Sequence, residues 1–177
     1  MQNLLRILES FDGKHAEPLV ELADGTPASE ANIQKLLALA EHDQALVRAG
    51  ATWVLKRWHD RGVNFSANAV ATMVRLLGQE TEWGSQLHLV QMLTILEIPK
   101  ASARKLKAEA AKLAHSENKF VRAWATSALA NLADQHPAYR HAALKVFAEV
   151  EQDAAASVKA RVRKVLKQFH WARRESE

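Results

Sequence analysis

Cysteine is absent from this chain of 177 residues, and only six glycines and four prolines occur in it. The missing thiols exclude a disulfide framework, a thiolate metal site and a cysteine nucleophile. No apolar run approaches the ~20 residues that span a bilayer, and the first residues lack the positive lead and apolar core of a secretion signal. Strand signals are absent as well. We therefore expect a cytoplasmic protein that does not enter a membrane.

Sequence motifs of common enzymes are also missing. The eight histidines are scattered singly, without a His-Glu-x-x-His motif or two histidines four residues apart. No Gly-x-Ser-x-Gly and no phosphate-binding Gly-x-x-x-x-Gly-Lys occurs. His88, in an apolar segment, is more typical of a buried histidine than of a metal ligand. The sequence therefore predicts a non-catalytic protein without metal or cofactor.

The chain contains instead a repeat of 37 residues without insertion or deletion. Apolar residues recur at this spacing and also follow the 3.6-residue period of a helix within each repeat. Acidic residues recur in the short links, at Asp43, Glu80 and Glu117. Two apolar ladders illustrate the register: Leu36, Met73, Ala110 and Phe147, and Leu55, Met92, Leu129 and Leu166.

We expect each repeat to form a pair of helices. Prolines mark the start of a new repeat, and proline is tolerated in a helix only at its first turn. The predicted pairs are 29–42 with 44–60, 66–78 with 82–97, 100–115 with 118–134, and 138–152 with 155–171.

The residues that open the second helices carry a family resemblance. Asp43-Gln-Ala-Leu-Val47-Arg48-Ala49 and Glu117-Asn-Lys-Phe-Val121-Arg122-Ala123 resemble the signature of HEAT repeats, over about residues 27–171. In the second repeat Gly84-Ser85-Gln86 replaces the signature. The resemblance implies an α-α superhelix, or solenoid, of about four HEAT-like helix pairs. Such repeats mostly serve as protein-binding scaffolds, but some belong to DNA-repair glycosylases and other enzymes.

Residues 1–26 do not follow the repeat and are predicted to form an amino-terminal helical cap. Residues 27–177 form the array, with repeats at about 27–63, 64–100, 101–137 and 138–174, and we expect one cooperative domain overall. Charge is unevenly distributed along the chain. Residues 1–43 carry a net charge of −5 and residues 154–177 a net charge of +5.

The predicted helix 82–97 is apolar on every side. Such a helix is either completely buried or presents an exposed patch, and exposed patches mark interfaces. Arginine at the repeat position of Arg48 and Arg122 either selects an acidic partner segment or ties adjacent repeats together. The predicted function is a scaffold for a protein partner with an acidic segment, and self-association remains open. The partner-binding candidates are Trp83, Leu87, Val90, Leu93, Arg48, Trp53, Arg122 and Trp124.

A nucleic-acid-binding protein is the alternative, using the basic carboxyl-terminal helix. A solvated helix face explains the same cations, and Ser85 interrupts any basic row along the repeats. The HEAT-like DNA glycosylases use tryptophan, aspartate and arginine, and the same residue types occur here at Trp53, Arg57 and Asp60, although no motif of that family matches. The nucleic-acid candidates are Lys159, Arg161, Arg163, Lys164 and Lys167.

Overall fold

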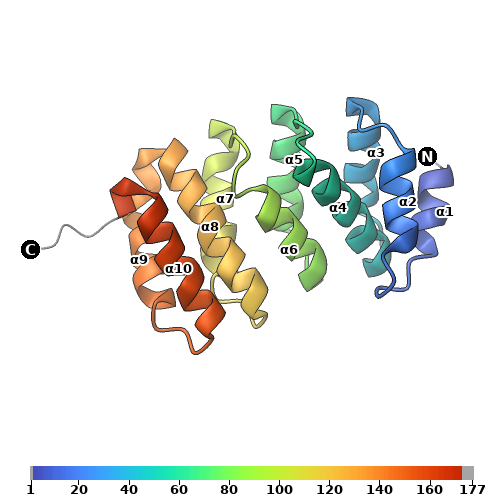
Figure 1. Cartoon of the computed structure of the whole chain (residues 1–177). Helices are drawn as coiled ribbons and strands as arrows, with labels where there is room; N and C mark the ends of the chain where they lie inside the picture. The colour runs from blue at the N-terminus through green and yellow to red at the C-terminus, as the bar shows by residue number, and fades with distance from the viewer. Residues whose placement is uncertain (1, 173–177) are drawn as a thin grey trace, which may run out of the picture. The chain divides into compact units, whose positions relative to one another are not determined.

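A computed structural model describes residues 2–172, and this part of the chain is all-helical, with ten α-helices, two short 3-10 helices and no strand (Figure 1). The predicted all-α class is confirmed. Every predicted helix of the four pairs begins and ends within three residues of an observed one, except the helix that was expected to continue to residue 97. The chain divides into two compact units, Met1–Met92 and Leu93–Glu177. The single cooperative domain stays a prediction.

The first unit contains six helices, in which α1 and α2 precede two helix pairs. Ser29 and Ser66 begin the first helix of each pair, because their hydroxyls accept a hydrogen bond from the backbone N–H groups of Asn32 and Ala69. The helices are α1 Gln2–Glu9, α2 Glu17–Gly25, α3 Glu30–Leu39, α4 Ala45–Asp60, α5 Ala67–Leu77 and α6 Trp83–Met92.

The long helix α4 organises the first unit, since α1, α2, α3 and α6 all pack against it. Gly50 on α4 lets the amino-terminal helices approach, because a Cβ atom at this position would lie 2.9 Å from Leu8 and 3.2 Å from Leu19. Both leucines are completely buried. At the other end of α4, the buried Trp58 donates its indole N–H to the carbonyl of Ala23 at 3.0 Å. Both ends of α4 are thus attached to the amino-terminal hairpin.

The second unit contains four α-helices and the two 3-10 helices. Helix α8 packs against α7, α9 and α10. At the carboxyl-terminal end, the Trp171 ring lies 6.3 Å from Phe147 and its N–H donates to Asp134 at 3.1 Å. The elements are α7 Lys100–Leu113, α8 Lys119–Gln135, η1 Pro137–Tyr139, α9 Arg140–Val150, α10 Ala156–Gln168 and η2 His170–Ala172.

The predicted helix 82–97 is wrong at its carboxyl end, because α6 ends at Met92. Residues 93–98 of the second unit instead form a turn that is held by side chains of α8. The Asn131 side chain donates to the carbonyls of Leu93 and Leu96, both at 2.9 Å. Gln135 accepts from the N–H of Ile98 at 2.7 Å. These hydrogen bonds satisfy backbone groups that a continued helix would have paired internally.

We expect Gly50→Leu to destabilise the protein by about 1–3 kcal/mol, because the new side chain would displace Leu8 and Leu19 from a filled site. Urea unfolding followed by circular dichroism measures the change. Gly25→Ala is the matched control, since no atom lies within 4 Å of a Cβ built there. An unchanged midpoint for Gly50→Leu would contradict the close packing of the hairpin on α4.

Candidate functional site: the surfaces of the second helices

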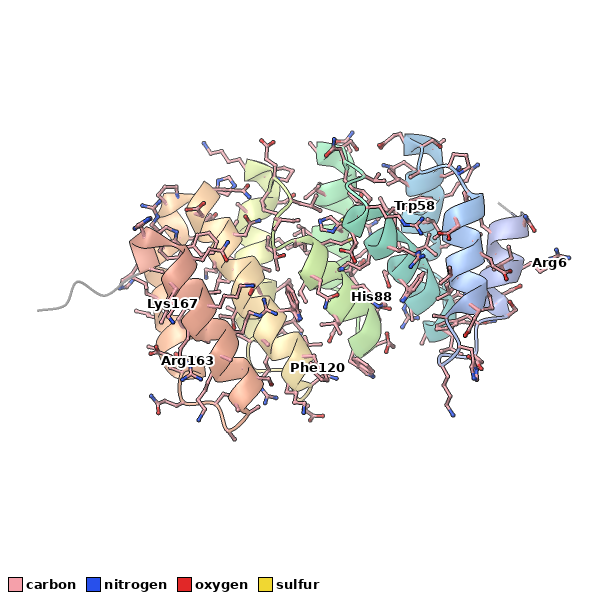
Figure 2. All side chains as sticks on the ribbon, in the orientation of Figure 1. Arg6, Trp58, His88, Phe120, Arg163 and Lys167 are labelled. Atoms are coloured by element: carbon pink, nitrogen blue, oxygen red, sulfur yellow. The ribbon has the colours of Figure 1, made fainter. Side chains whose placement is uncertain are left out.

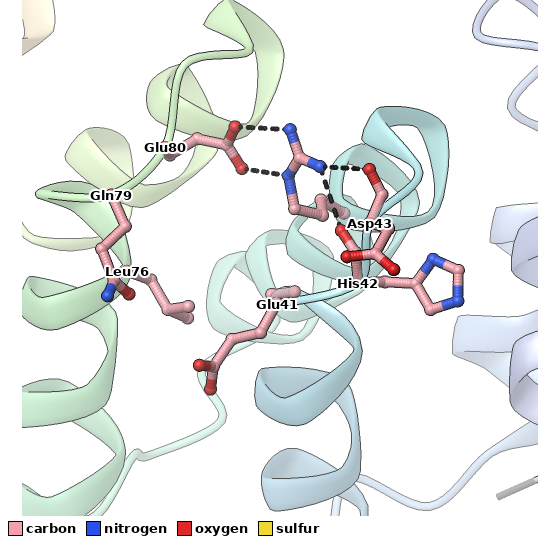
Figure 3. A pocket seen from close by; sticks show the side chains of 8 residues that line it. Glu41, His42, Asp43, Leu76, Gln79 and Glu80 are labelled. Atoms are coloured by element: carbon pink, nitrogen blue, oxygen red, sulfur yellow. Dashed lines mark hydrogen bonds and ion pairs between the residues drawn. The ribbon is translucent and has the colours of Figure 1, made fainter.

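The Arg48 side chain joins two helix pairs within the first unit (Figure 3). Its Nε and Nη2 atoms donate to the two carboxylate oxygens of Glu80 at 3.0 and 3.1 Å. Its Nη1 atom donates to the carbonyls of His42 and Asp43, both at 3.0 Å. The Arg48 and Glu80 side chains are only 18% and 4% exposed. We call this arrangement the Arg48 clamp.

Arg122 repeats the arrangement within the second unit. It donates to both carboxylate oxygens of Asp153 at 2.6 and 3.1 Å, and to the carbonyls of Ser116 and Glu117 at 2.8 and 3.0 Å. The guanidinium holds the pKa of Asp153 below its usual range. Arg48 and Arg122 were candidates for selecting an acidic partner, but internal carboxylates already occupy both. This geometry corresponds to the other interpretation, in which these arginines tie repeats together.

The second repeat lacks this arginine, and its helix α6 begins differently. Ser85 occupies the arginine position, is buried, and has a hydroxyl without a hydrogen-bond partner among the described residues. The neighbouring Gln86 donates to the carbonyl of Glu80 at 2.7 Å, six residues back. Arg48 and Arg122 reach a carbonyl at the same separation. Gln86 therefore keeps the link inside the repeat, but has no charge with which to bind a second repeat.

The apolar patch predicted on the helix 82–97 is largely core. Val90 and Leu93 are completely buried, so they offer no surface to a partner and that part of the prediction is corrected. Leu87 is half-buried, whereas Trp83 keeps 53% of its surface exposed. The all-round apolar pattern thus combines buried positions with one exposed tryptophan at the start of α6.

A pocket of about 300 Å³ opens between residues of α4 and α6 in the first unit. The Arg57 guanidinium lies over the Trp53 ring, 5.5 Å from its centroid. Lys56 donates to both carboxylate oxygens of Asp60, at 2.6 and 2.5 Å. The lining residues are Trp53, Lys56, Arg57, Asp60, Arg61, His88 and Gln91, and we call this site the Trp53 pocket.

Positive charge exceeds negative charge in the lining of the Trp53 pocket, where Lys56, Arg57 and Arg61 face the single carboxylate of Asp60. Asp24 of α2 contacts Arg61 at 2.5 Å and Arg57 at 3.5 Å. These contacts fix the positions of both guanidinium groups without using all of their N–H donors. With Asp24 included, three cationic side chains face two carboxylates, and this excess of one positive charge favours an anionic ligand.

His88 of α6 also lines the pocket and is labelled in Figure 2. Its Nδ1 atom lies 3.1 Å from the Thr52 hydroxyl, whose oxygen is also within hydrogen-bond distance of the carbonyls of Arg48 and Ala49, at 3.0 and 3.1 Å. The direction of the Thr52–His88 hydrogen bond follows the tautomer of the ring, because a hydroxyl both donates and accepts. Burial lowers the pKa of His88 from 6.5 to about 4, so the ring is neutral at pH 7.

Trp124 and Arg161 form a comparable pair in the second unit. The Arg161 guanidinium lies 3.8 Å from the Trp124 ring centroid, and burial lowers the pKa of Arg161. Lys159 is half-buried, while Arg163, Lys164 and Lys167 are exposed on α10, where Figure 2 labels two of them.

No group of three or more His, Asp and Glu side chains in residues 2–172 is placed to hold a metal ion. Trp53, Arg57 and Asp60 do line one pocket, although Lys56 holds Asp60 in an ion pair. None of the described helices has the length and hydropathy needed to cross a bilayer.

Sequence reasoning missed Lys56, Arg61 and Gln91 as members of the Trp53 pocket. The signal for the first two was present, since positions 53, 56, 57, 60 and 61 lie on one face of a helix. Gln91 and His88 belong to another helix, so only the packing of α4 on α6 could bring them to this face.

Comparisons with known proteins give a fold and no family. No protein-family model matches the chain. No curated protein matches it either. Among solved structures, the chain is similar to the crystal structure of an engineered protein, a Northeast Structural Genomics Consortium target, with a TM-score of 0.58 and 18% identity. The match covers 94% of this chain and 78% of the engineered protein. At this identity the likeness concerns the fold alone.

Replacing Arg122 by methionine should destabilise the protein by about 2–3 kcal/mol, because Asp153 would lose its charged partner in a site that is only 12% exposed. Chemical denaturation measures the loss. Arg75→Met is the matched control, because Arg75 and Glu41 form an exposed pair with side chains 41% and 45% accessible. It should cost about 0.5 kcal/mol or less. Equal losses of stability in the two variants would show that the Arg122–Asp153 pair stabilises the protein no more than an exposed ion pair does.

Stability should fall as the pH drops from about 6.5 to about 4, partly through His88. The unfolded histidine takes up a proton in this window while the folded one, with its pKa lowered to about 4, does not. The stabilisation that comes from neutral His88 is complete above the pKa of the unfolded state, 6.5, and is lost as the pH falls toward the pKa of the folded state, about 4. The free energy of unfolding, measured by denaturation at pH 7 and at pH 5, should differ less between the two pH values for His88→Gln than for the wild type. His141→Gln, on the exposed side of α9, should retain the wild-type difference.

Proposed function

We propose that this chain is a non-catalytic protein-interaction module of HEAT-like repeats, which acts in the cytoplasm. Its first unit binds an acidic segment of a partner protein at the Trp53 pocket. The observation that carries the proposal is the convergence of Trp53, Arg57 and Arg61 on one pocket with excess positive charge. Tryptophan and arginine are the residues most often found at the energetic centre of protein interfaces.

The pocket is prepared for an anionic side chain before a partner arrives. Arg57 is held between the Trp53 ring and Asp24, so less conformational entropy is lost when it binds a carboxylate. A planar guanidinium with spare N–H donors suits a carboxylate in two-point contact. The His88 ring also lines the pocket, and its neutral form at pH 7 adds no positive charge to that of the two arginines.

Two features of the same pocket support binding rather than catalysis. A histidine with a pKa of about 4 is a weak proton acceptor at neutral pH. Asp60 forms an ion pair with Lys56, and its carboxylate is therefore a poor candidate for a general base. We therefore favour a partner-binding role over a glycosylase-like one for Trp53, Arg57 and Asp60.

Nucleic-acid binding at α10 remains the second candidate, because Arg161 stacks on Trp124 and a base could stack on the same ring. Arg163 and Lys164 next to it make no ion pair among the described residues. Phosphate contacts would have to come from these exposed cations. Binding by two such contacts would weaken about tenfold between 50 and 200 mM salt.

Affinity for the partner should fall about 30-fold when Trp53 is replaced by alanine and further when Arg57 and Arg61 are replaced by glutamate. Acidic peptides selected from a display library against the full chain provide the ligands, and calorimetry measures the affinity. Arg163→Glu with Lys164→Glu is the matched control, since it changes the same charge on exposed positions of α10.

Capture from cell lysate, with and without nuclease, completes the test. A protein that survives nuclease and is lost with the Trp53-pocket variants supports the proposal. Retention of nucleic acid that is lost only with the α10 variant would favour the second candidate instead.

A further inference from the structure

A second surface of the first unit carries exposed apolar side chains at a repeated position. Leu46 and Trp83 are 37 residues apart, on the first turns of α4 and α6, and are 45% and 53% exposed. Phe120 occupies the same repeat position in the second unit and is 49% exposed. Helical repeats bury apolar residues at most in-phase positions, so exposure that recurs in phase is not explained by the core.

The Arg48 clamp fixes Leu46 and Trp83 relative to each other. Leu46 lies two residues before Arg48, and Trp83 follows Glu80 by three residues. The two clamp residues are bound through two hydrogen bonds, and α4 packs on α6. Leu46 also rests against Gly13, where a Cβ atom would be 3.0 Å from it. We call Leu46 and Trp83, with the clamp between them, the apolar edge.

A polar pocket of about 420 Å³ adjoins the apolar edge and carries negative charge (Figure 3). Its carboxylates are those of Glu41, Asp43 and Glu80, and it includes Arg48. Glu41 pairs with Arg75, and Glu80 with Arg48, so these charges are compensated. Asp43 makes no ion pair among the described residues, but its charge helps to raise the pKa of Arg48, so it acts on the same guanidinium as Glu80. One guanidinium thus faces two carboxylates, and an excess of negative charge remains for a cation from outside.

The start of α6 adds a third carboxylate near Arg48, that of Glu82, whose charge also raises the pKa of Arg48. Glu82 accepts the backbone N–H groups of Gly84 and Ser85 at 2.8 and 2.6 Å and forms no ion pair in the described part of the chain. It directly precedes Trp83, which is the more exposed residue of the apolar edge. Carboxylates and an exposed indole side by side suit a cationic group, through ion pairing and through the face of the ring.

We propose that the apolar edge is a docking surface for a partner segment that combines apolar residues with lysine or arginine. The apolar residues would cover Leu46 and Trp83, and a cationic side chain would enter the neighbouring pocket toward Asp43. The charge preference is opposite to that of the Trp53 pocket, and the two surfaces share no residue. This inference therefore does not depend on the acidic-partner proposal.

The test is an unbiased peptide-display selection against the full chain, followed by affinity measurements on the selected peptides. We expect one class of binders in which lysine or arginine flanks apolar residues. The affinity of this class should fall at least about tenfold with Leu46→Ser and Trp83→Ser combined, and also with Asp43→Lys. It should be unchanged with Arg57→Glu, which affects only the Trp53 pocket.

Ile95→Ser is the matched control, because Ile95 is the most exposed large apolar side chain described, at 71%, but lies outside the repeated position. Loss of binding with Ile95→Ser alone, or full binding by the Leu46→Ser and Trp83→Ser variant, would overturn the proposal. So would a selection that returns no basic apolar class. A dimer in sedimentation that disappears in this variant would assign the edge to a second copy and overturn it as well. Acidic binders lost only with Arg57→Glu would leave the Trp53-pocket proposal standing in each case.

Discussion

The geometry of both compact units depends on an arginine that binds two backbone carbonyls of its own repeat and a carboxylate of the next. A guanidinium group can do this because its donors point in fixed directions in one plane. Arg48 uses them on His42, Asp43 and Glu80, and Arg122 uses them on an equivalent set. The starts of the second helices are thereby fixed, and both proposed binding surfaces of the first unit lie on these helices.

The same interaction neutralises two arginines that the sequence alone would suggest as binding residues. Arg48 and Arg122 are obvious basic residues in the sequence, yet their charge is used inside the protein. The charge offered to a ligand comes from Arg57 and Arg61, which are only partly engaged by Asp24, and from Asp43 and Glu82, which share the guanidinium of Arg48 with Glu80. Two surfaces of opposite charge preference result, although the chain as a whole carries a net charge of only +4.

The positions of the helices could be predicted from the sequence, because both the apolar stripes and the breaks between helices recur every 37 residues. The sequence was not sufficient for the end of α6, since the turn after Met92 depends on amide side chains of α8 nearly 40 residues away. Burial of Val90 could not be separated from exposure of Trp83, because periodicity alone does not say which side of an all-apolar helix is covered. His88 needed the structure for a similar reason, as its hydrogen-bond partner Thr52 belongs to another helix.

A photo-reactive amino acid in place of Gln91, which lines the Trp53 pocket, would identify what binds at this pocket in the cell. We expect irradiation of cells containing this variant to link the chain to a protein through an acidic stretch, which mass spectrometry locates. The same group in place of the exposed Lys105 on α7 should give no such product. Crosslinks from position 91 to nucleic acid, or no product beyond that seen from position 105, would contradict the account.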